Sequence, residues 1–260
     1  PLFINILLKF MVIVFRFHKN KLYHCYNPSM TARIGKREIE GFLFDVDGTF
    51  YGKEEHNRIF DAIQLQLAVA ILAASGKSKT SDDEIRLMKS KYLEKVAEIG
   101  KWQRSFIELG GSPDQYRILA GDADRSRHLN FNPELRLTLD KIKALPTKLG
   151  ILTSAATEVT KNTCSKLLGN GWNNLFEVVV CEDSLPSNIQ KPDLRVFQFA
   201  NEKLGVSPER AAMVGDSIGD DILPAAALGM LTVYVGEKES GPWDLHLRRV
   251  EELAAYLTNA

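Results

Sequence analysis

Cysteine is scarce in this sequence of 260 residues, and the charged residues leave no net charge. The three cysteines, Cys25, Cys164 and Cys181, are too few and too widely spaced for a disulfide framework or a CxxC metal site. This scarcity favours a reducing, intracellular setting, and we expect a cytoplasmic protein. Thirty-three basic residues balance thirty-three acidic ones, so the overall charge does not indicate a nucleic-acid partner.

Internal repeats and low-complexity tracts are also missing from the sequence. Apolar residues make up 45% of it and charged residues 25%, which are ordinary proportions for a globular protein and exclude a mainly disordered chain. The length fits one large domain, or one domain that carries an insert.

The N-terminal segment is apolar and basic but contains no long hydrophobic run. Asn5, Lys9 and Arg16 interrupt it, and its longest apolar stretch covers only residues 10–15, whereas a membrane-spanning helix needs about 20 apolar residues. A signal peptide should begin with charge and end at a small-residue cleavage site, and neither is present. We therefore expect residues 1–29 to be an extra segment outside the fold, with a membrane-surface anchor as the alternative. Beyond this segment we expect no membrane partner.

Short apolar runs recur along the rest of the chain, with helical patterns between them. Pro133 and Pro208 each follow a helix-capping residue and mark helix starts. Strands that alternate with helices predict βαβ units, and therefore an α/β fold with a parallel sheet. The predicted strands cover residues 41–44, 149–152, 176–180, 211–214 and 231–235. We expect the tail, residues 243–257, to form an amphipathic helix on this sheet.

The interval between the first two strands has a different character. Residues 53–132 contain no convincing strand; apolar residues recur at helical spacing over 59–74, and Ser81 and Glu84 form a capping box. We expect this interval to be an all-helical cap inserted into a core made of residues 30–52 and 133–260. Within it, we interpret residues 125–128 (Arg-Ser-Arg-His) as a solvated loop rather than a nucleic-acid patch, with a contact to an anionic substrate as the alternative.

Polar and acidic side chains cluster at the predicted strand ends. In an open α/β sheet, ligands bind at the edge formed by the carboxyl ends of the strands. A lysine precedes the helix before the fourth strand, and the other residues directly follow the first, second and fourth strands. The set comprises Asp45, Asp47, Thr153, Ser154, Lys191, Asp216, Asp220 and Asp221. So many chemically distinct groups at one edge are hard to explain by packing alone.

These residues lie in four segments, DVDGT, ILTSA, KPD and GDSIGDD, in that order. The set resembles the four motifs of the haloacid dehalogenase (HAD) superfamily of phosphohydrolases, and the resemblance covers residues 42–236. It implies a Rossmann-like parallel sheet. The insert lies between the first and second motifs, which is where the helical C1 cap of this superfamily is found.

The resemblance also implies roles for the motif residues. Asp45 would be the nucleophile that forms an aspartyl-phosphate, and Asp47 the general acid and then the general base. Thr153 would donate a hydrogen bond to a phosphoryl oxygen, a role that Ser154 can also fill. Lys191 would neutralise developing negative charge and hold Asp45 in place.

A magnesium ion is the cofactor that this motif set implies. Mg²⁺ prefers oxygen ligands and keeps several of its waters. Asp45, the backbone carbonyl of Asp47, and Asp216 would bind it directly. A further carboxylate would accept hydrogen bonds from its waters; the motif spacing favours Asp221, with Asp220 as the alternative.

The expected activity is Mg²⁺-dependent hydrolysis of a small phosphorylated metabolite, such as a nucleotide or a sugar phosphate. The motif order and the helical insert most resemble the pyrimidine 5′-nucleotidase-like branch. A phosphomutase of the same superfamily would share Asp45 and Asp47 and remains an alternative. A catalytically silent fold used as a binding module would show eroded motifs, and none of the four is eroded here.

Overall fold

The structure is a computed structural model. It describes residues 31–260 except residues 78, 101, 122, 124, 186–188, 239 and 260. The prediction for residues 1–29 concerns residues outside this range.

A parallel sheet of six strands forms the centre of the fold, in the order β5-β4-β3-β6-β7-β8. The predicted α/β class is therefore confirmed. The central strands are buried along their whole length, as expected where helices cover both faces of a parallel sheet. The strands are β3 (Gly41–Phe44), β4 (Lys148–Leu152), β5 (Val178–Val180), β6 (Ala211–Gly215), β7 (Leu231–Val235) and β8 (Leu245–Leu247).

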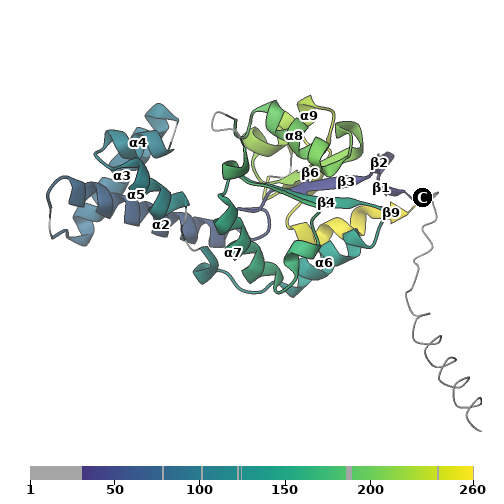
Figure 1. Cartoon of the computed structure of the whole chain (residues 1–260), viewed down its shortest axis with the longest axis horizontal. Coiled ribbons are helices and arrows are strands. Elements are labelled where there is room, and N and C mark those ends of the chain that lie inside the picture. The colour runs from purple at the N-terminus through teal and green to yellow at the C-terminus, as the bar shows by residue number, and fades with distance from the viewer. Residues whose placement is uncertain are drawn as a thin grey trace, which may run out of the picture. The chain divides into compact units, whose positions relative to one another are not determined.

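Helices pack on both faces of this sheet (Figure 1). The helices α6 (Pro133–Lys143) and α7 (Thr157–Leu168) lie on one face, and α8 (Leu194–Leu204) and α9 (Leu223–Ala227) lie on the other. Successive side chains of a strand point to opposite faces. Phe42 and Phe44 therefore join one hydrophobic cluster with α6 and α7, while Leu43 joins the other with α8. Short helical turns complete the connections: η3 (Trp172–Asn174), η4 (Glu182–Ser184), η5 (Pro208–Arg210) and η6 (Ile218–Ile222).

The C-terminal tail differs from its prediction as one amphipathic helix. Asp244 accepts hydrogen bonds from the backbone N–H and the hydroxyl of Thr232, at 2.8 and 3.0 Å, and this anchors the chain beside β7. Trp243 stacks on Tyr234 with 4.3 Å between ring centroids. These contacts favour strand β8 over a helix, because pairing with β7 satisfies the backbone groups. The chain continues as the 3₁₀ helix η7 (Val250–Tyr256) and strand β9 (Leu257–Asn259).

A smaller antiparallel sheet, which the strand patterns did not predict, includes β9. Its order is β2-β1-β9, with β1 (Ala32–Ile34) and β2 (Arg37–Ile39) forming a hairpin. In this sheet β1, the first described strand, pairs with β9, the last one.

The interval between β3 and β4 is helical up to α6. It contains α2 (Lys53–Ala74), α3 (Asp82–Ile99), α4 (Trp102–Glu108), α5 (Pro113–Tyr116), the π-helix η1 (Arg117–Gly121) and the 3₁₀ helix η2 (Arg125–His128). We refer to residues 53–132 as the helical insert. The predicted capping box is present, because the Ser81 hydroxyl accepts from the Glu84 N–H and the Glu84 carboxylate accepts from the Ser81 N–H. Tyr92 is fully buried and contacts Phe106 edge-on, and both belong to the hydrophobic cluster that also contains Phe42 and Phe44 of β3.

Helix α2 is, among the described helices, the one long and apolar enough to cross a membrane. Its residues Ile59, Leu67 and Ile71 are buried in the main hydrophobic cluster. Helix α2 qualifies by length and composition only, and a buried core helix qualifies as well, so the finding is weak evidence for a membrane span.

Candidate functional site

The turn after β3 positions the first pair of acidic residues. The Asp45 N–H donates to the Val214 carbonyl at 2.9 Å, which ties the end of β3 to the end of β6. The chain then turns tightly, with the N–H groups of Thr49 and Phe50 both donating to the Val46 carbonyl. Gly48 has φ +83°, a left-handed conformation that favours glycine, and a Cβ at this position would collide with the carboxylate of Asp216.

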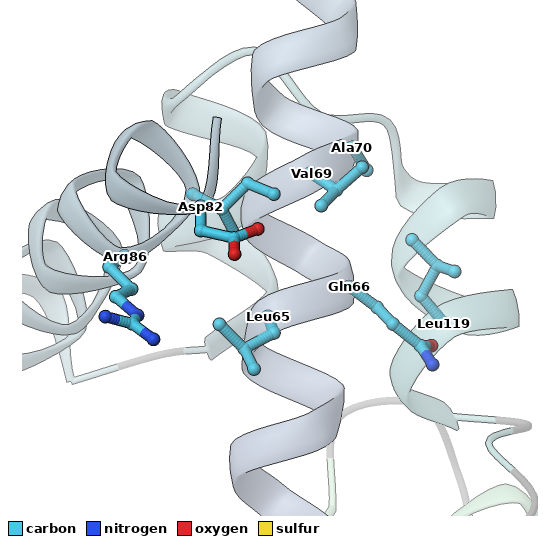
Figure 2. Close-up of a pocket in the computed structure, with 8 residues that line it drawn as sticks. Leu65, Gln66, Val69, Ala70, Asp82, Arg86 and Leu119 are labelled. Carbon is cyan, nitrogen blue, oxygen red and sulfur yellow. The ribbon is translucent and has the colours of Figure 1, made fainter. Parts of the chain in front are cut away.

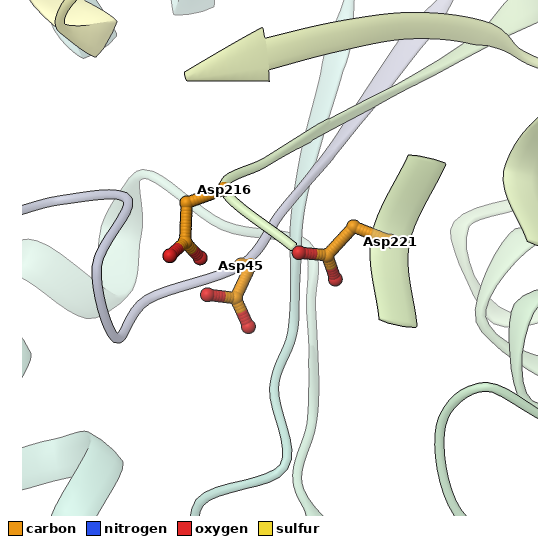
Figure 3. Close-up of side chains that lie close together, drawn as sticks. All are labelled: Asp45, Asp216 and Asp221. Atoms are coloured by element: carbon orange, nitrogen blue, oxygen red, sulfur yellow. The ribbon is translucent and has the colours of Figure 1, made fainter. Parts of the chain in front are cut away.

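Three carboxylates converge at this edge of the sheet (Figure 3). Asp45 follows β3, Asp216 follows β6, and Asp221 lies in η6. One oxygen from each lies within 4.8 Å of the other two. Asp45 and Asp221 are buried, and Asp216 is partly buried. The sheet order places β3 beside β6, so the topology itself brings the first two carboxylates together.

Lys191 is the cation inside this cluster. Its Nζ donates to Asp45 Oδ1 and to Asp221 Oδ1, both at 2.7 Å, and its side chain is 4% exposed. The Thr49 hydroxyl lies between two of the acids, 3.3 Å from Asp45 Oδ2 and 3.4 Å from Asp216 Oδ1. The charged groups are therefore paired and hydrogen-bonded, as buried charges require.

Burial and mutual repulsion shift the proton affinity of the three acids. Burial raises the pKa of Asp45, and Lys191 offsets this only in part. Burial raises the pKa of Asp216 to about 6, with the charge of Asp221 adding to the effect. Burial also raises the pKa of Asp221 to about 6 against the attraction of Lys191. Three crowded carboxylates with one ammonium group attract further positive charge, so a hard divalent cation fits this donor set.

Asp47 has a different environment from the three clustered acids. The Tyr51 hydroxyl donates to Asp47 Oδ1 at 2.5 Å, and Arg125 Nη1 donates to Asp47 Oδ2. Burial raises the pKa of Tyr51, so the phenol stays protonated and able to donate. Burial lowers the pKa of Arg125 to about 10, against the charge of Asp45, so its guanidinium stays charged at neutral pH. Asp47 is therefore held by one donor from the core and one from the helical insert.

The remaining predicted residues take distinct positions. Thr153 is buried at the end of β4, where its hydroxyl accepts from the Ala155 N–H at 3.2 Å, and Ser154 beside it is exposed. Asp220 is exposed and pairs with the Ser217 hydroxyl at 3.2 Å, outside the carboxylate cluster. The geometry therefore brings Asp221, and not Asp220, next to Lys191 and Asp45.

The insert also contains a mostly apolar pocket of about 580 Å³, whose lining includes none of the predicted site residues (Figure 2). Residues of α2, α3 and η1 line it: Leu65, Gln66, Val69, Ala70, Asp82, Ile85, Arg86 and Leu119. Its lining has one acidic and one basic side chain, Asp82 and Arg86, whereas three carboxylates and a lysine meet at the sheet edge, so the carboxylate cluster is the better candidate for chemistry.

Residues 39–229 match the family model for haloacid dehalogenase-like hydrolases. The chain belongs to this family. A glyceraldehyde 3-phosphate phosphatase from Methanocaldococcus jannaschii is 27% identical over 76% of this chain and 85% of its own length. A phosphoserine phosphatase from Thermus thermophilus is 33% identical, over 52% of each chain. A phosphoglycolate phosphatase from Psychrobacter arcticus is 29% identical over 68% of this chain and 75% of its own. These names support the prediction of a phosphoric monoester hydrolase.

Solved structures agree on the fold of this haloacid dehalogenase-like hydrolase. A HAD phosphatase from Thermococcus onnurineus superposes with a TM-score of 0.61 over 84% of this chain and 97% of that one, at 23% identity. CbbY from Rhodobacter sphaeroides, in complex with phosphate, gives 0.57 at 20% identity, over 83% and 96% of the two chains.

Arg125 is the site residue for which the prediction was wrong. Residues 125–128 form a 3₁₀ helix instead of a solvated loop, and Arg125 is buried against Asp47 and over the ring of Phe60. Asp47 lies 78 residues away in the chain. The contact depends on how the insert packs on the core, which strand and helix patterns do not encode. The only signal in the sequence that could have indicated a contact with an acidic group was the basic character of residues 125–128.

Proposed function

We propose that this hydrolase is a Mg²⁺-dependent phosphatase that acts on a small phosphorylated metabolite through an aspartyl-phosphate on Asp45. The carboxylate cluster around Lys191 is the observation that carries the proposal. Three buried or partly buried carboxylates and a buried ammonium group lie together at the sheet edge where α/β proteins bind ligands, and this supports Asp45 as the nucleophile and its neighbours as oxygen donors for a cation. The phosphatase names of the relatives support the same class.

The donor set fits magnesium. Asp45, Asp216 and the backbone carbonyl of Asp47 would hold the ion, and Asp221 would accept hydrogen bonds from its waters. The raised pKa values of Asp216 and Asp221 support this, because carboxylates that repel one another gain most from a bound cation. When bound, the ion neutralises phosphoryl charge and aligns the phosphoryl group with the nucleophile.

The residues of the chain supply the two chemical steps. In the first, a carboxylate oxygen of Asp45 attacks phosphorus, the bond from phosphorus to the ester oxygen breaks, and Asp47 gives its proton to the leaving alkoxide. In the second, Asp47 takes a proton from water while the water oxygen attacks phosphorus. The bond to Asp45 then breaks, releasing inorganic phosphate and restoring the free carboxylate. Lys191 keeps Asp45 oriented throughout.

The helical insert, residues 53–132, would act as a cap that covers the substrate and excludes water. Its contact with the core through Arg125 and Asp47 supports this role. Such a cover would limit the size of the substrate. The relatives are named for small phosphate esters, which agrees with a small substrate. The pyrimidine nucleotidase branch and the cytoplasmic location stay predictions.

Hydrolysis of an aryl phosphate, with Mg²⁺ and with a chelator in its place, tests the proposal. We expect turnover that requires the metal. If the metal makes no difference to the rate, magnesium dependence is wrong. If neither the aryl phosphate nor a panel of nucleotides and sugar phosphates is hydrolysed, the phosphatase assignment fails, and transfer between sugar phosphates should then be assayed for a mutase.

Magnesium binding should also change stability in a way that depends on pH. Asp216 and Asp221 have folded-state pKa values near 6, above the ordinary value of 3.8. Without Mg²⁺, the folded protein thus binds more protons than the unfolded chain between about pH 4 and pH 6, and this contribution to stability is lost as the pH rises through about 6. Protons compete with the cation at low pH. Mg²⁺ should therefore stabilise the fold by about 1–3 kcal/mol when well above its dissociation constant near neutral pH, and much less near pH 5.

Thermal unfolding with and without Mg²⁺ at the two pH values measures this effect. Asp216→Asn should remove the stabilisation, whereas Asp220→Asn is a matched control on an exposed carboxylate and should keep it. An equal shift at both pH values, or one that survives Asp216→Asn, would place the metal elsewhere.

A further inference from the structure

Arg125 reaches the candidate site from the helical insert. It lies in η2, is 7% exposed, and donates through Nη1 to Asp47 Oδ2. The other oxygen of Asp47 accepts from Tyr51. The guanidinium therefore stands beside the carboxylate that faces the leaving group in the proposed reaction.

An aromatic wall supports this guanidinium. The Phe60 ring lies under it, with 5.3 Å from Cζ to the ring centroid. His56 stacks on Phe60 at 4.3 Å between centroids, and Tyr51 lies 6.3 Å from His56 in a stacked orientation. Contacts thus run in a closed loop from Asp47 through Tyr51, His56 and Phe60 to Arg125 and back to Asp47. Such a loop fixes the position of the charge more tightly than one ion pair does.

The guanidinium also has unused binding capacity. Its Nε is buried and, within the described part of the chain, makes no hydrogen bond. A buried donor without an acceptor is unfavourable, so a ligand oxygen that accepts from this N–H would relieve that cost as well as form a hydrogen bond. Arginine binds a carboxylate or phosphate side-on through Nε and its neighbouring Nη. In Arg125, Nη1 donates to Asp47, so the edge formed by Nε and Nη2 is the one available for a second anionic group.

We propose that Arg125 selects substrates that carry a second anionic group, a carboxylate or a second phosphate, a few bonds from the phosphoryl group that is cleaved. This inference rests on the proposed function for the placement of that phosphoryl group at Asp45. Because Nε is covered, we infer that a small rotation of the guanidinium over the Phe60 ring, with Nη1 kept on Asp47, presents this edge when the anion binds. A small ester of this kind, a trianion with a carboxylate or a tetraanion with a second phosphate, thus bridges the core and the insert.

A set of matched substrates tests the selection. Glycerol 3-phosphate and 3-phosphoglycerate differ in a neutral hydroxymethyl group against a carboxylate, and propane-1,3-diol bisphosphate offers a second phosphate instead. We expect wild type to have the higher kcat/KM for at least one of the two substrates with the second anion. Arg125→Met should lower the ratio of kcat/KM values, anionic over neutral, by about thirtyfold, as expected for losing a charge-assisted pair. The substrate whose ratio falls in Arg125→Met, the carboxylate or the bisphosphate, identifies the anion that Arg125 binds.

The ratio matters because Arg125→Met also removes a donor from Asp47 and will slow every substrate. Arg125→Lys, which keeps the charge but not the side-on geometry, should restore part of the ratio. Arg127→Met, a change of the exposed arginine two residues away, should leave the ratio unchanged. An unchanged ratio in Arg125→Met, or no preference in wild type, overturns the proposal.

Protection from thermal unfolding by the same three compounds separates this proposal from the proposed function. If these compounds, the aryl phosphate and the panel of nucleotides and sugar phosphates are all left unhydrolysed, the phosphatase proposal fails. The anion site still stands in that case if the two compounds with a second anion protect wild type better than glycerol 3-phosphate does and lose this advantage in Arg125→Met. If the compounds are hydrolysed with a ratio that does not depend on Arg125, the phosphatase proposal stands and the anion site fails.

Discussion

Asp45→Asn should abolish phosphatase activity, lowering kcat by at least about 10⁴-fold, because loss of a nucleophile removes the covalent route altogether. The fold should survive the change. Burial and the charge of Asp216 disfavour the ionised carboxylate at position 45, so a neutral amide relieves repulsion there. The measurement is steady-state turnover of an aryl phosphate together with thermal unfolding of the same preparation.

Asp220→Asn is the matched control for this prediction. It makes the same chemical change in the neighbouring GDSIGDD segment, but on a carboxylate that is exposed and pairs only locally with Ser217. Its kcat should stay within about threefold of wild type, as for a surface substitution away from the chemistry. Equal losses in the two variants would show that negative charge in this region, and not the Asp45 oxygen, is what the reaction requires.

Lys191→Met should give the largest loss of stability of any single change at the site. Lys191 is buried and bonded to two buried carboxylates, and its own pKa is raised by Asp221 and Asp45 despite the opposing effect of burial. Removing it leaves Asp45 and Asp221 without their cation, and breaking a buried ion pair typically destabilises a fold by about 3–5 kcal/mol. Denaturant unfolding of wild type and variant measures the difference.

The loss should depend on pH with a definite sign. Without the ammonium, Asp45 and Asp221 keep their protons to higher pH than in wild type, where the pKa of Asp221 is about 6. The variant therefore becomes less stable as the pH rises, and the difference from wild type should be larger near pH 8 than near pH 5. Lys161→Met, which removes an exposed partner of Glu158, should leave stability almost unchanged, because surface ion pairs are screened by solvent. A loss for Lys191→Met as small as that would contradict the tight pairing.

Much of the core was predictable from sequence because local sequence patterns determine its strands and helices. Apolar runs fix the strands, their alternation with helices fixes a parallel sheet, and residues that follow such strands must meet at one edge. Asp45 and Asp216 come together for this reason, and Lys191 joins them from the segment before α8. The motif spacing of the family that the sequence resembles ranked Asp221 above Asp220, and in the structure Asp221 contacts Lys191 whereas Asp220 is exposed. Their roles in catalysis and metal binding stay predictions.

The errors arose where long-range packing overrides local pattern. Residues 243–257 have helical spacing, but Asp244 and Trp243 attach this segment to β7, and the chain becomes a strand and a 3₁₀ helix. The residues around Arg125 in the sequence are typical of a solvated loop, but packing of the insert places Arg125 in contact with Asp47 and Phe60. In both cases, no repeat or residue spacing in the sequence indicates that the contacting residues meet.

Trapping the covalent intermediate tests the central claim most directly. Wild-type protein mixed with radiolabelled phosphate ester and quenched in acid should retain label on protein, and peptide mapping should place it on Asp45. Hydroxylamine, which cleaves acyl phosphates, should release the label, and Asp45→Asn should carry none. Rapid turnover without any acid-stable, Asp45-linked label at the earliest times would contradict the mechanism and point to direct attack by water.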